Sequence, residues 1–264
     1  MNAPLAILLG LVVALPASAA NYDVYLLAGQ SNMDGRGKVA DLSPEQRRPF
    51  ANVVIYYRNP PIATDGFKPL APGYSIAPND KVKTLPSPTF GPEIGFAKAM
   101  TKALPDRQFA LIKGSKGGTS LSRDWKPGAG PCYRNFIQTV ALARRALASD
   151  GSTPTLRGVL WLQGESDSKA TAKEYQQMLT AFIARLRADV HQPNLPFLVG
   201  EVADNGKRDA VRQAQRAVAQ TVLHVGFVPA DGLQTSDRGT HFDAASQLTL
   251  GERFAAAMLK LLKD

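Results

Sequence analysis

The amino-acid sequence predicts a single three-layer α/β domain, and three observations support that fold class. Short apolar, partly β-branched runs alternate with longer segments of helical periodicity from residue 22 to the end of the chain. Strands and helices that alternate in this way form a mostly parallel sheet covered by helices on both faces. The chain has 264 residues, which suits one large domain, and it contains neither an internal repeat nor an inter-domain linker.

The predicted strands are short apolar runs. The first covers residues 23–28 and is halted by Gly29, as expected of a buried parallel strand. Similar runs lie at 53–57, 109–113, 158–162 and 197–201, with a weaker one at 225–229. Helical periodicity predicts helices over 94–104, 171–190, 209–223 and 244–262. The helix at 171–190 is the best defined, because its apolar residues fall on one face.

The composition is that of a globular protein without a structural metal. With 44% apolar residues the chain can bury a substantial core, which excludes a disordered protein. The single cysteine, Cys132, excludes a disulfide framework and a zinc site built on paired thiolates, and three widely spaced histidines do not predict a metal centre. We interpret the formal net charge of +9 as a solvated basic surface and expect no nucleic-acid partner.

The first 20 residues predict a secretory signal peptide. Residues 5–15 form an uncharged apolar run, and Pro16 and a small-residue stretch follow it. Cleavage is expected near Ala19 or Ala20, which leaves 21–264 as one mature domain in the periplasm or outside the cell. The apolar run is shorter than the roughly 20 residues that a membrane-spanning helix needs, so no stable membrane insertion is expected after cleavage.

The segment 58–89 is the exception to the alternating pattern. It holds seven prolines and shows no periodicity, so it is expected to be a long loop. Loops of this length in a compact domain are usually functional lids or binding loops. We therefore predict that 58–89 is a lid that binds substrate.

Glycine and small polar residues follow the predicted strands, where ligands of parallel sheets bind. These segments are 29–35, 114–120 and 163–167, and a fourth, 237–243, precedes the last helix and carries a histidine. Acyl transfer needs a hydroxyl nucleophile, a base, an acid that orients the base, and free backbone N–H donors. The four segments together supply all of these groups.

Four sequence blocks resemble the conserved blocks of the SGNH hydrolases. They are Gly29-Gln30-Ser31-Asn32-Met33, Gly117-Gly118-Thr119-Ser120, Gln163-Gly164-Glu165-Ser166-Asp167 and His241-Phe242-Asp243, in the order of that family. The match is closest to the branch that holds carbohydrate esterase family 6 and the sialate O-acetylesterase-like proteins. This resemblance implies a flavodoxin-like fold with a central, mostly parallel five-stranded sheet. It also implies an acetylesterase that acts on acetylated carbohydrate, such as acetylxylan or O-acetyl sialic acid, without a metal or cofactor.

The resemblance also implies roles for individual residues. Ser31 is the expected nucleophile and His241 its general base, and the expected oxyanion donors are the N–H groups of Ser31 and Gly118 with Gln163 as a third donor. Asp237 is the expected acid, although the family usually places aspartate three residues before the histidine and Asp237 lies four before it.

Two alternatives to Asp237 stay open. Glu165 is the rival acid, because its Gln-Gly-Glu block has been assigned that role in parts of this branch. A backbone carbonyl that serves a Ser-His dyad is the third possibility. We expect Asp243 to cap the last helix instead.

For the substrate site, Gln30 and the aromatic side chains are the candidates. Trp125 is the first choice for a wall on which a sugar ring stacks, followed by Tyr74 and Phe67 of the long loop, with core packing as the alternative reading of each. Two other functions also remain: a lipase or thioesterase of the same superfamily that acts on lipid acyl chains, and a non-catalytic carbohydrate-binding protein.

Overall fold

The computed structural model describes residues 20–60, 62–76 and 88–263. The predicted signal peptide, apart from Ala20, lies outside the described residues, and so does part of the predicted lid, namely residues 61 and 77–87.

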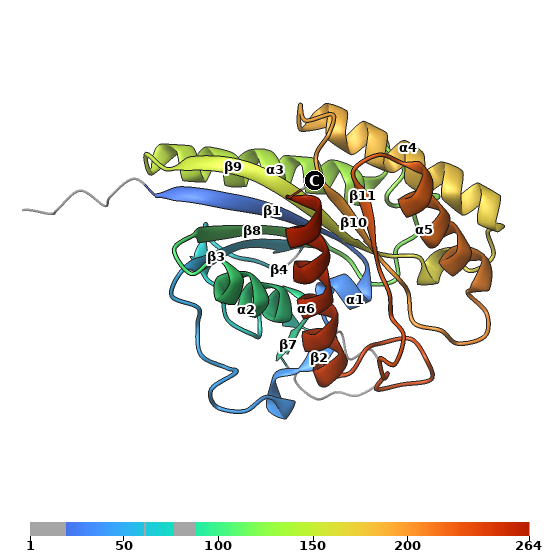
Figure 1. Cartoon of the computed structure of the whole chain (residues 1–264), viewed down its shortest axis with the longest axis horizontal. Coiled ribbons are helices and arrows are strands. Elements are labelled where there is room, and N and C mark those ends of the chain that lie inside the picture. Colours follow the sequence, from blue (N-terminus) through green and yellow to red (C-terminus); the bar gives the residue numbers. More distant parts are fainter. Residues whose placement is uncertain (1–19, 61, 77–87, 264) are drawn as a thin grey trace, which may run out of the picture.

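The centre of the molecule is a twisted sheet whose six long strands are all parallel (Figure 1). Their order across the sheet is β11 (Val225–Val228), β10 (Phe197–Gly200), β9 (Thr153–Leu162), β1 (Asn21–Gly29), β8 (Gln108–Ser115) and β3 (Val53–Asn59). Two short strands, β4 (Ile62–Ala63) and β5 (Lys68–Pro69), pair antiparallel with β3 at the edge. The predicted α/β class with a mostly parallel sheet is confirmed, but the predicted number of five strands is too low. The weak run near residue 225 forms a full parallel strand, and the proline-rich segment adds two more strands.

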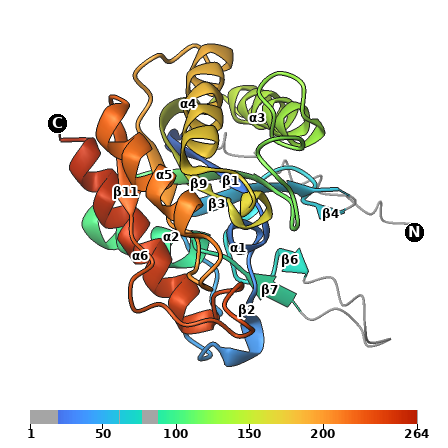
Figure 2. The same ribbon diagram turned by 90° about the vertical axis from the view of Figure 1, so that its right-hand side faces the viewer.

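Helices cover both faces of this sheet, as Figure 2 shows from the side. One face carries α3 (Pro131–Ser149), α4 (Ala172–Asp189) and α5 (Asp209–Thr221), and the other carries α2 (Glu93–Ala103) and α6 (Ala244–Leu261). β1 supplies both cores, because Val24 and Leu26 face the first helix layer while Tyr25 and Leu27 face the second. Helix α3 is absent from the sequence-based prediction, although Pro131 stands at its first turn, where proline is favoured.

Part of the segment 58–89 is regular structure, which corrects the prediction of an unstructured loop. Besides β4 and β5, it contains β6 (Ser75–Ile76) and the start of β7 (Pro88–Phe90). These strands join β2 (Gly37–Lys38) in a small antiparallel sheet of order β2-β7-β6. The segment is therefore tied at both ends to the domain.

The register of the sheet brings the carboxyl ends of its three central strands to one level. Gly29 at the end of β1 pairs with Ser115 of β8 and with Leu162 of β9. A side chain at Gly29 would collide with the carbonyl oxygen of Leu162, and its φ of +148° is also unfavourable for other residues. Glycine therefore lets β1 turn sharply into α1 (Ser31–Asp34), which begins with the predicted nucleophile.

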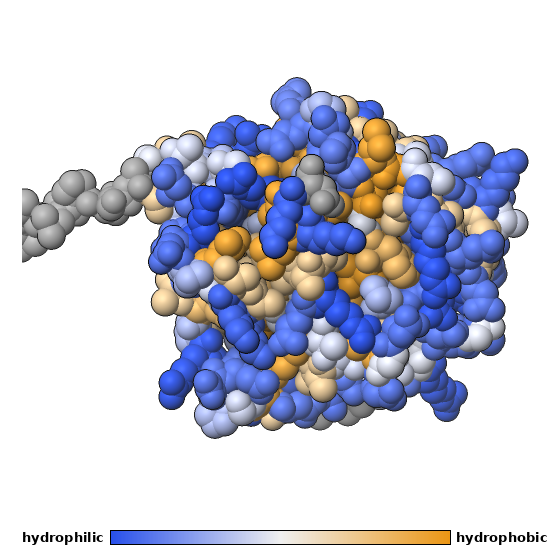
Figure 3. All heavy atoms as spheres, viewed as in Figure 1, coloured by the Kyte–Doolittle hydropathy of each residue, from blue (hydrophilic) through white to orange (hydrophobic). Residues whose placement is uncertain are grey.

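Hydrophilic residues dominate the face of the molecule in Figure 3, and hydrophobic residues lie there in small patches. Among the described residues, the exposed large hydrophobic side chains are Leu223, at 80%, and Leu262, at 39%. No helix in the described part of the chain combines the length and the apolar character needed to cross a membrane.

Candidate active site

Three of the predicted catalytic residues form one line of hydrogen bonds. The imidazole of His241 has its Nε2 atom 3.1 Å from the Oγ atom of Ser31. On the other side of the ring, Nδ1 lies 2.6 Å from the Oδ2 atom of Asp237. Ser31 begins α1 at the end of β1, while Asp237 and His241 lie in the loop that precedes α6. The arrangement has the order hydroxyl, imidazole, carboxylate that activates a serine nucleophile.

The conformation of the loop from Asp237 to His241 explains how a carboxylate four residues before the histidine can reach its imidazole. Gly239 has a φ of +78°, which closes a tight turn. The other carboxylate oxygen of Asp237, Oδ1, accepts hydrogen bonds from the backbone N–H groups of Thr240 at 2.8 Å and His241 at 2.9 Å. The carboxylate is thus fixed by the same loop that carries the imidazole. Asp243 caps α6 by accepting a hydrogen bond from the N–H of Ser246, as predicted.

The environment favours a neutral imidazole and an ionised carboxylate. Burial lowers the pKa of His241, Asp237 opposes this effect, and the positive charges of Arg36 and Arg208 lower the pKa further. For Asp237, burial acts to raise the pKa, but the hydrogen bonds from His241 and Thr240 outweigh it and the pKa is lowered. A neutral imidazole that donates Nδ1–H to Asp237 presents an unprotonated Nε2 to the Ser31 hydroxyl.

Glu165, the rival acid, lies against a different partner. Its Oε1 atom accepts a hydrogen bond of 2.6 Å from the Nδ2 atom of Asn32, and its Oε2 atom has no partner in the described part of the chain. Burial raises the pKa of Glu165, and the hydrogen bonds and Arg208 only partly offset this. The structure therefore brings Asp237, and not Glu165, to the imidazole.

Asn32 and Arg208 hold the histidine loop, and sequence reasoning missed both. The Nδ2 atom of Asn32 also donates to the carbonyl of Thr240 at 2.8 Å, and its Oδ1 atom accepts from the N–H of Phe242 at 3.0 Å. Arg208 donates to the carbonyl of Gly239 at 2.8 Å and to the hydroxyl of Thr240 at 3.1 Å. The position of Asn32 directly after Ser31 in the first sequence block was the available signal. Glu165 therefore contacts the histidine loop only through Asn32, whose side chain it helps to hold in position.

Replacing Glu165 by glutamine is expected to lower kcat by less than about tenfold, because an amide oxygen can still accept the Asn32 hydrogen bond and one such bond contributes little net free energy. Glu165→Ala removes that acceptor and is expected to lower the melting temperature as well. The measurement is kcat and thermal unfolding of both variants. A loss of about a thousandfold or more in Glu165→Gln, with unchanged unfolding, would instead give Glu165 the role of the acid.

Three backbone N–H groups at or near Ser31 in the predicted oxyanion segments have no internal hydrogen-bond partner among the described residues. The N–H groups of Ser31, Gly117 and Gly118 donate no hydrogen bond to other described residues. Gly117 lies next to Ser31, since a Cβ atom at Gly117 would be in ordinary contact with the Cβ atom of Ser31, at 3.5 Å. Gly118 has a φ of +70° and open space where a side chain would be. Gly117 therefore lies next to Ser31, and the N–H groups of both glycines have no partner among the described residues.

The side chain of Gln163 does not lie where the predicted role of a third oxyanion donor would require it. The residue is fully buried, and its Nε2 atom donates to the side chain of Asp167 at 2.6 Å and to the carbonyl of Thr119 at 3.0 Å. Both N–H bonds are thus used inside the protein, so Gln163 cannot donate to a substrate. It is instead a buried link between the ends of two strands.

Asp34 organises a second polar cluster under the nucleophile. Its carboxylate accepts hydrogen bonds from Arg36 at 2.7 Å, from the hydroxyl groups of Tyr57 at 2.7 Å and Ser115 at 2.9 Å, and from Asn59 at 3.1 Å. The guanidinium of Arg36 is held in this way at the edge of the site. A Cβ atom at Gly117 would lie 2.8 Å from its Nη2 atom, so Arg36 lies on the same side of Gly117 as Ser31.

A buried ion pair also contacts the short helix α1, which carries Ser31. The ammonium of Lys113 lies 2.8 Å from the carboxylate of Glu93 and donates to the carbonyl of Asp34 at 2.7 Å. The Lys113 and Glu93 side chains are 0% and 3% exposed. Lys113 thus binds both Glu93 and the last residue of α1, which helps to fix α1 and with it the position of Ser31. Removing either charge would leave the other buried without a partner, which is costly.

Comparisons with known proteins identify the family of this chain. A family model described as carbohydrate esterase, sialic acid-specific acetylesterase, matches residues 21–260. The chain belongs to this family. A probable carbohydrate esterase of Arabidopsis thaliana is 26% identical over 261 residues, covering 89% of this chain and 90% of the relative. This sialic acid-specific acetylesterase family member is accordingly a carboxylic ester hydrolase of the carbohydrate esterase type.

Solved structures resemble the fold of this family member closely. The structure of a protein from Arabidopsis thaliana superposes with a TM-score of 0.73 at 25% identity, covering 91% of this chain and 98% of that one. The structure of NanS gives a TM-score of 0.66 at 18% identity, with coverage of 94% and 99%.

The predicted substrate-binding residues of the esterase lie in three different settings. Trp125 is 1% exposed and packs edge-on against Trp161 and Phe136, so it is not the exposed stacking wall that was predicted. Gln30 is 2% exposed, and its Oε1 atom accepts hydrogen bonds inside the protein. Tyr74 is half-buried and donates to the carbonyl of Pro69 at 2.7 Å. The core-packing alternative thus describes Trp125 better than an exposed wall does.

The described residues of the esterase contain no group of three or more histidine, cysteine, aspartate or glutamate side chains that could hold a metal ion.

Proposed function

We propose that this carbohydrate esterase is an exported serine acetylesterase that removes O-acetyl groups from carbohydrate through Ser31, His241 and Asp237. The observation that carries the proposal is the continuous hydrogen-bond line from the Ser31 hydroxyl through both imidazole nitrogens to the Asp237 carboxylate. Export is proposed from residues 1–20, whose sequence has the features of a signal peptide.

In the acylation step, the Ser31 hydroxyl loses its proton to Nε2 of His241 while its Oγ atom attacks the acetyl carbonyl carbon. The carbonyl oxygen takes up negative charge and accepts hydrogen bonds from the N–H groups of Ser31 and Gly118. The protonated His241 then donates its proton to the sugar oxygen as the ester bond breaks. An acetyl group remains on Ser31, and the sugar leaves with a free hydroxyl group.

In the deacylation step, His241 removes a proton from water, which attacks the acetyl group on Ser31. The proton then returns to the Oγ atom of Ser31, and acetate leaves. Through both steps Asp237 accepts the Nδ1–H bond and stabilises the positive imidazolium. The buried Asp34 cluster supports this by holding Arg36 beside the nucleophile, where its positive charge favours the developing anion.

A release assay tests this function against its two alternatives. Acetate release is measured from acetylated xylan, from O-acetyl sialic acid and from the p-nitrophenyl esters of acetate, butyrate and octanoate. We expect release from at least one glycan and a rate that falls steadily from acetate to octanoate. A preference for octanoate would make the protein a lipase or thioesterase. Glycan binding without hydrolysis of any ester would make it a non-catalytic binding protein.

A further inference from the structure

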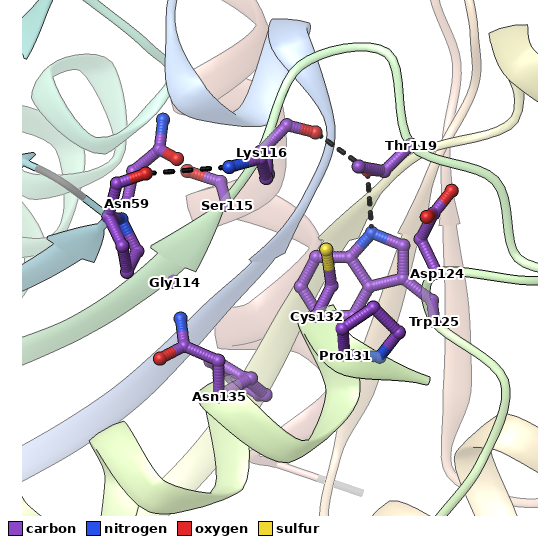
Figure 4. Close-up of a pocket in the computed structure, with 12 residues that line it drawn as sticks. Asn59, Gly114, Ser115, Lys116, Thr119, Asp124, Trp125, Pro131, Cys132 and Asn135 are labelled. Carbon is purple, nitrogen blue, oxygen red and sulfur yellow. Dashed lines mark hydrogen bonds between the residues drawn. The ribbon is translucent and has the colours of Figure 1, made fainter. Parts of the chain in front are cut away.

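A cavity of about 360 Å³ lies on the α3 side of the sheet, beside the segment that follows β8 (Figure 4). Its walls come from the ends of β3 and β8, the segment 115–119, and the first turns of α3. Lys116 lines the cavity, while the next residue, Gly117, packs on Ser31. The backbone N–H of Lys116 is bonded to the carbonyl of Gly29 at 3.1 Å, which ties this wall to the turn that carries Ser31. The segment after β8 thus borders the cavity through Lys116 and Thr119 and lies against Ser31 through Gly117.

The lining combines an apolar floor with polar side chains that can still bind a ligand. The apolar part of the lining comes from Pro60, Pro131 and Cys132; Trp125 and Phe136 lie beneath them and are only 1% and 0% exposed. The carboxamide of Asn135 makes no hydrogen bond to other described residues, and Asn59 uses only its N–H group, on Asp34. Figure 4 shows Asn59 and Lys116 on one side of the cavity and Cys132 and Asn135, both from α3, on the other.

This pattern favours an uncharged ring that carries hydroxyl groups. A sugar ring presents an apolar C–H face that suits the rings of Pro60 and Pro131, and hydroxyl groups that suit carboxamides and an ammonium group. A long acyl chain would leave the polar side chains without partners, which is unfavourable. A strongly anionic ligand is also disfavoured, because the lining includes the carboxylate of Asp124 as well as the ammonium of Lys116.

We propose that this cavity binds a second sugar ring of the substrate, adjoining the ring whose acetyl group is removed at Ser31. The proposal rests on the proposed acetylesterase function and adds that the natural substrate is an oligosaccharide or polysaccharide. Since Ser31 does not line the cavity, a ring bound there is a neighbour of the reacting ring and contributes to substrate binding without touching the reacting atoms.

Cys132 gives a direct readout of occupancy, because it is the only cysteine of the chain and lines the cavity. Burial, with a smaller effect of Asp124, raises the pKa of the Cys132 thiol to about 11. Labelling with methyl methanethiolsulfonate at about pH 9 is therefore slow enough to follow by mass spectrometry, since only the thiolate reacts. We expect at least one of the uncharged oligosaccharides xylotetraose, chitotetraose and mannotetraose to slow labelling by about threefold or more at saturation, whereas glycerol does not. Equal labelling rates with and without every oligosaccharide would overturn the proposal.

A substitution on α3 tests the same cavity during catalysis. Asn135→Trp fills the space next to Trp125, and Gln138→Trp, on the exposed side of the same helix, is the matched control. The measurement is the ratio of kcat/KM for an acetylated oligosaccharide to kcat/KM for p-nitrophenyl acetate. We expect Asn135→Trp to lower this ratio about tenfold or more, mainly through KM, and Gln138→Trp to keep the wild-type ratio. An unchanged ratio in Asn135→Trp would contradict the second subsite.

The two experiments separate this proposal from the proposed function. If wild-type protein releases acetate from a glycan but no oligosaccharide protects Cys132, the subsite is wrong and the esterase function stands. If oligosaccharides protect Cys132 but no glycan acetate is hydrolysed, the cavity binds sugar and the proposed reaction is wrong.

Discussion

Ser31→Ala is expected to abolish acetyl-ester hydrolysis and to leave the fold intact. Loss of the nucleophile removes the covalent step, and losses of this kind reach roughly 10⁶-fold in kcat. The Ser31 hydroxyl bonds to His241 rather than to a core residue, so its removal should disturb little else. The measurement is the rate of acetate release from p-nitrophenyl acetate and from an acetylated glycan.

The control for this prediction is Ser149→Ala, which removes an exposed hydroxyl at the end of α3. It should keep wild-type turnover, and both variants should unfold at the wild-type temperature. Substantial turnover by a correctly folded Ser31→Ala protein would show that Ser31 is not the nucleophile.

Asp237→Asn is expected to lower kcat by up to about 10⁴-fold with little change in stability. An asparagine can keep the two backbone hydrogen bonds that Oδ1 accepts from Thr240 and His241. The other oxygen, however, becomes an NH₂ group that faces Nδ1 and can only donate to it. The imidazole must then carry its proton on Nε2, where it can no longer accept the proton of Ser31.

The matched control is Asp231→Asn, at an exposed carboxylate between β11 and the histidine loop, which should keep wild-type kcat. If Asp237→Asn costs less than about tenfold while Glu165→Gln is crippling, the assignment of the acid is wrong.

The pH profile gives an independent readout of the same pair. Because His241 must be neutral to act as a base, activity falls as pH falls through its pKa. Burial, aided by Arg36 and Arg208, lowers that pKa despite the opposing effect of Asp237, so the acid limb of kcat/KM should lie below the ordinary histidine value of about 6.5. Loss of the Asp237 charge should move this limb to still lower pH. A wild-type limb well above that value would contradict the environment described for His241.

Local patterns in the sequence were sufficient for the main elements of the fold. Buried parallel strands read as short apolar runs, and α4 reads as a helix because its apolar residues repeat with helical spacing. Since parallel strands end at a common edge, the same patterns predicted that Ser31 and the glycines near 117 would lie together. The sequence did not predict helix α3 or the short strands of the segment 58–89. Their stability comes from packing and from pairing at the sheet edge, and their sequences lack a clear periodicity of apolar residues.

Which carboxylate faces His241 was decided only by the tertiary structure. In the sequence, Glu165 follows a predicted strand and Asp237 precedes the last helix, and both are compatible with an acid role. The turn at Gly239 brings Asp237 under the imidazole, whereas Asn32, 133 residues away in the chain, takes the hydrogen bond of Glu165. From the sequence, Trp125 could be a sugar-stacking wall or a core residue. The structure shows that it is a core residue, packed against aromatic rings of α3, β9 and α4. The sequence alone determined which chemical groups stand at the strand ends, because that depends on local periodicity; their partners depend on contacts between distant segments, which only the packed structure specifies.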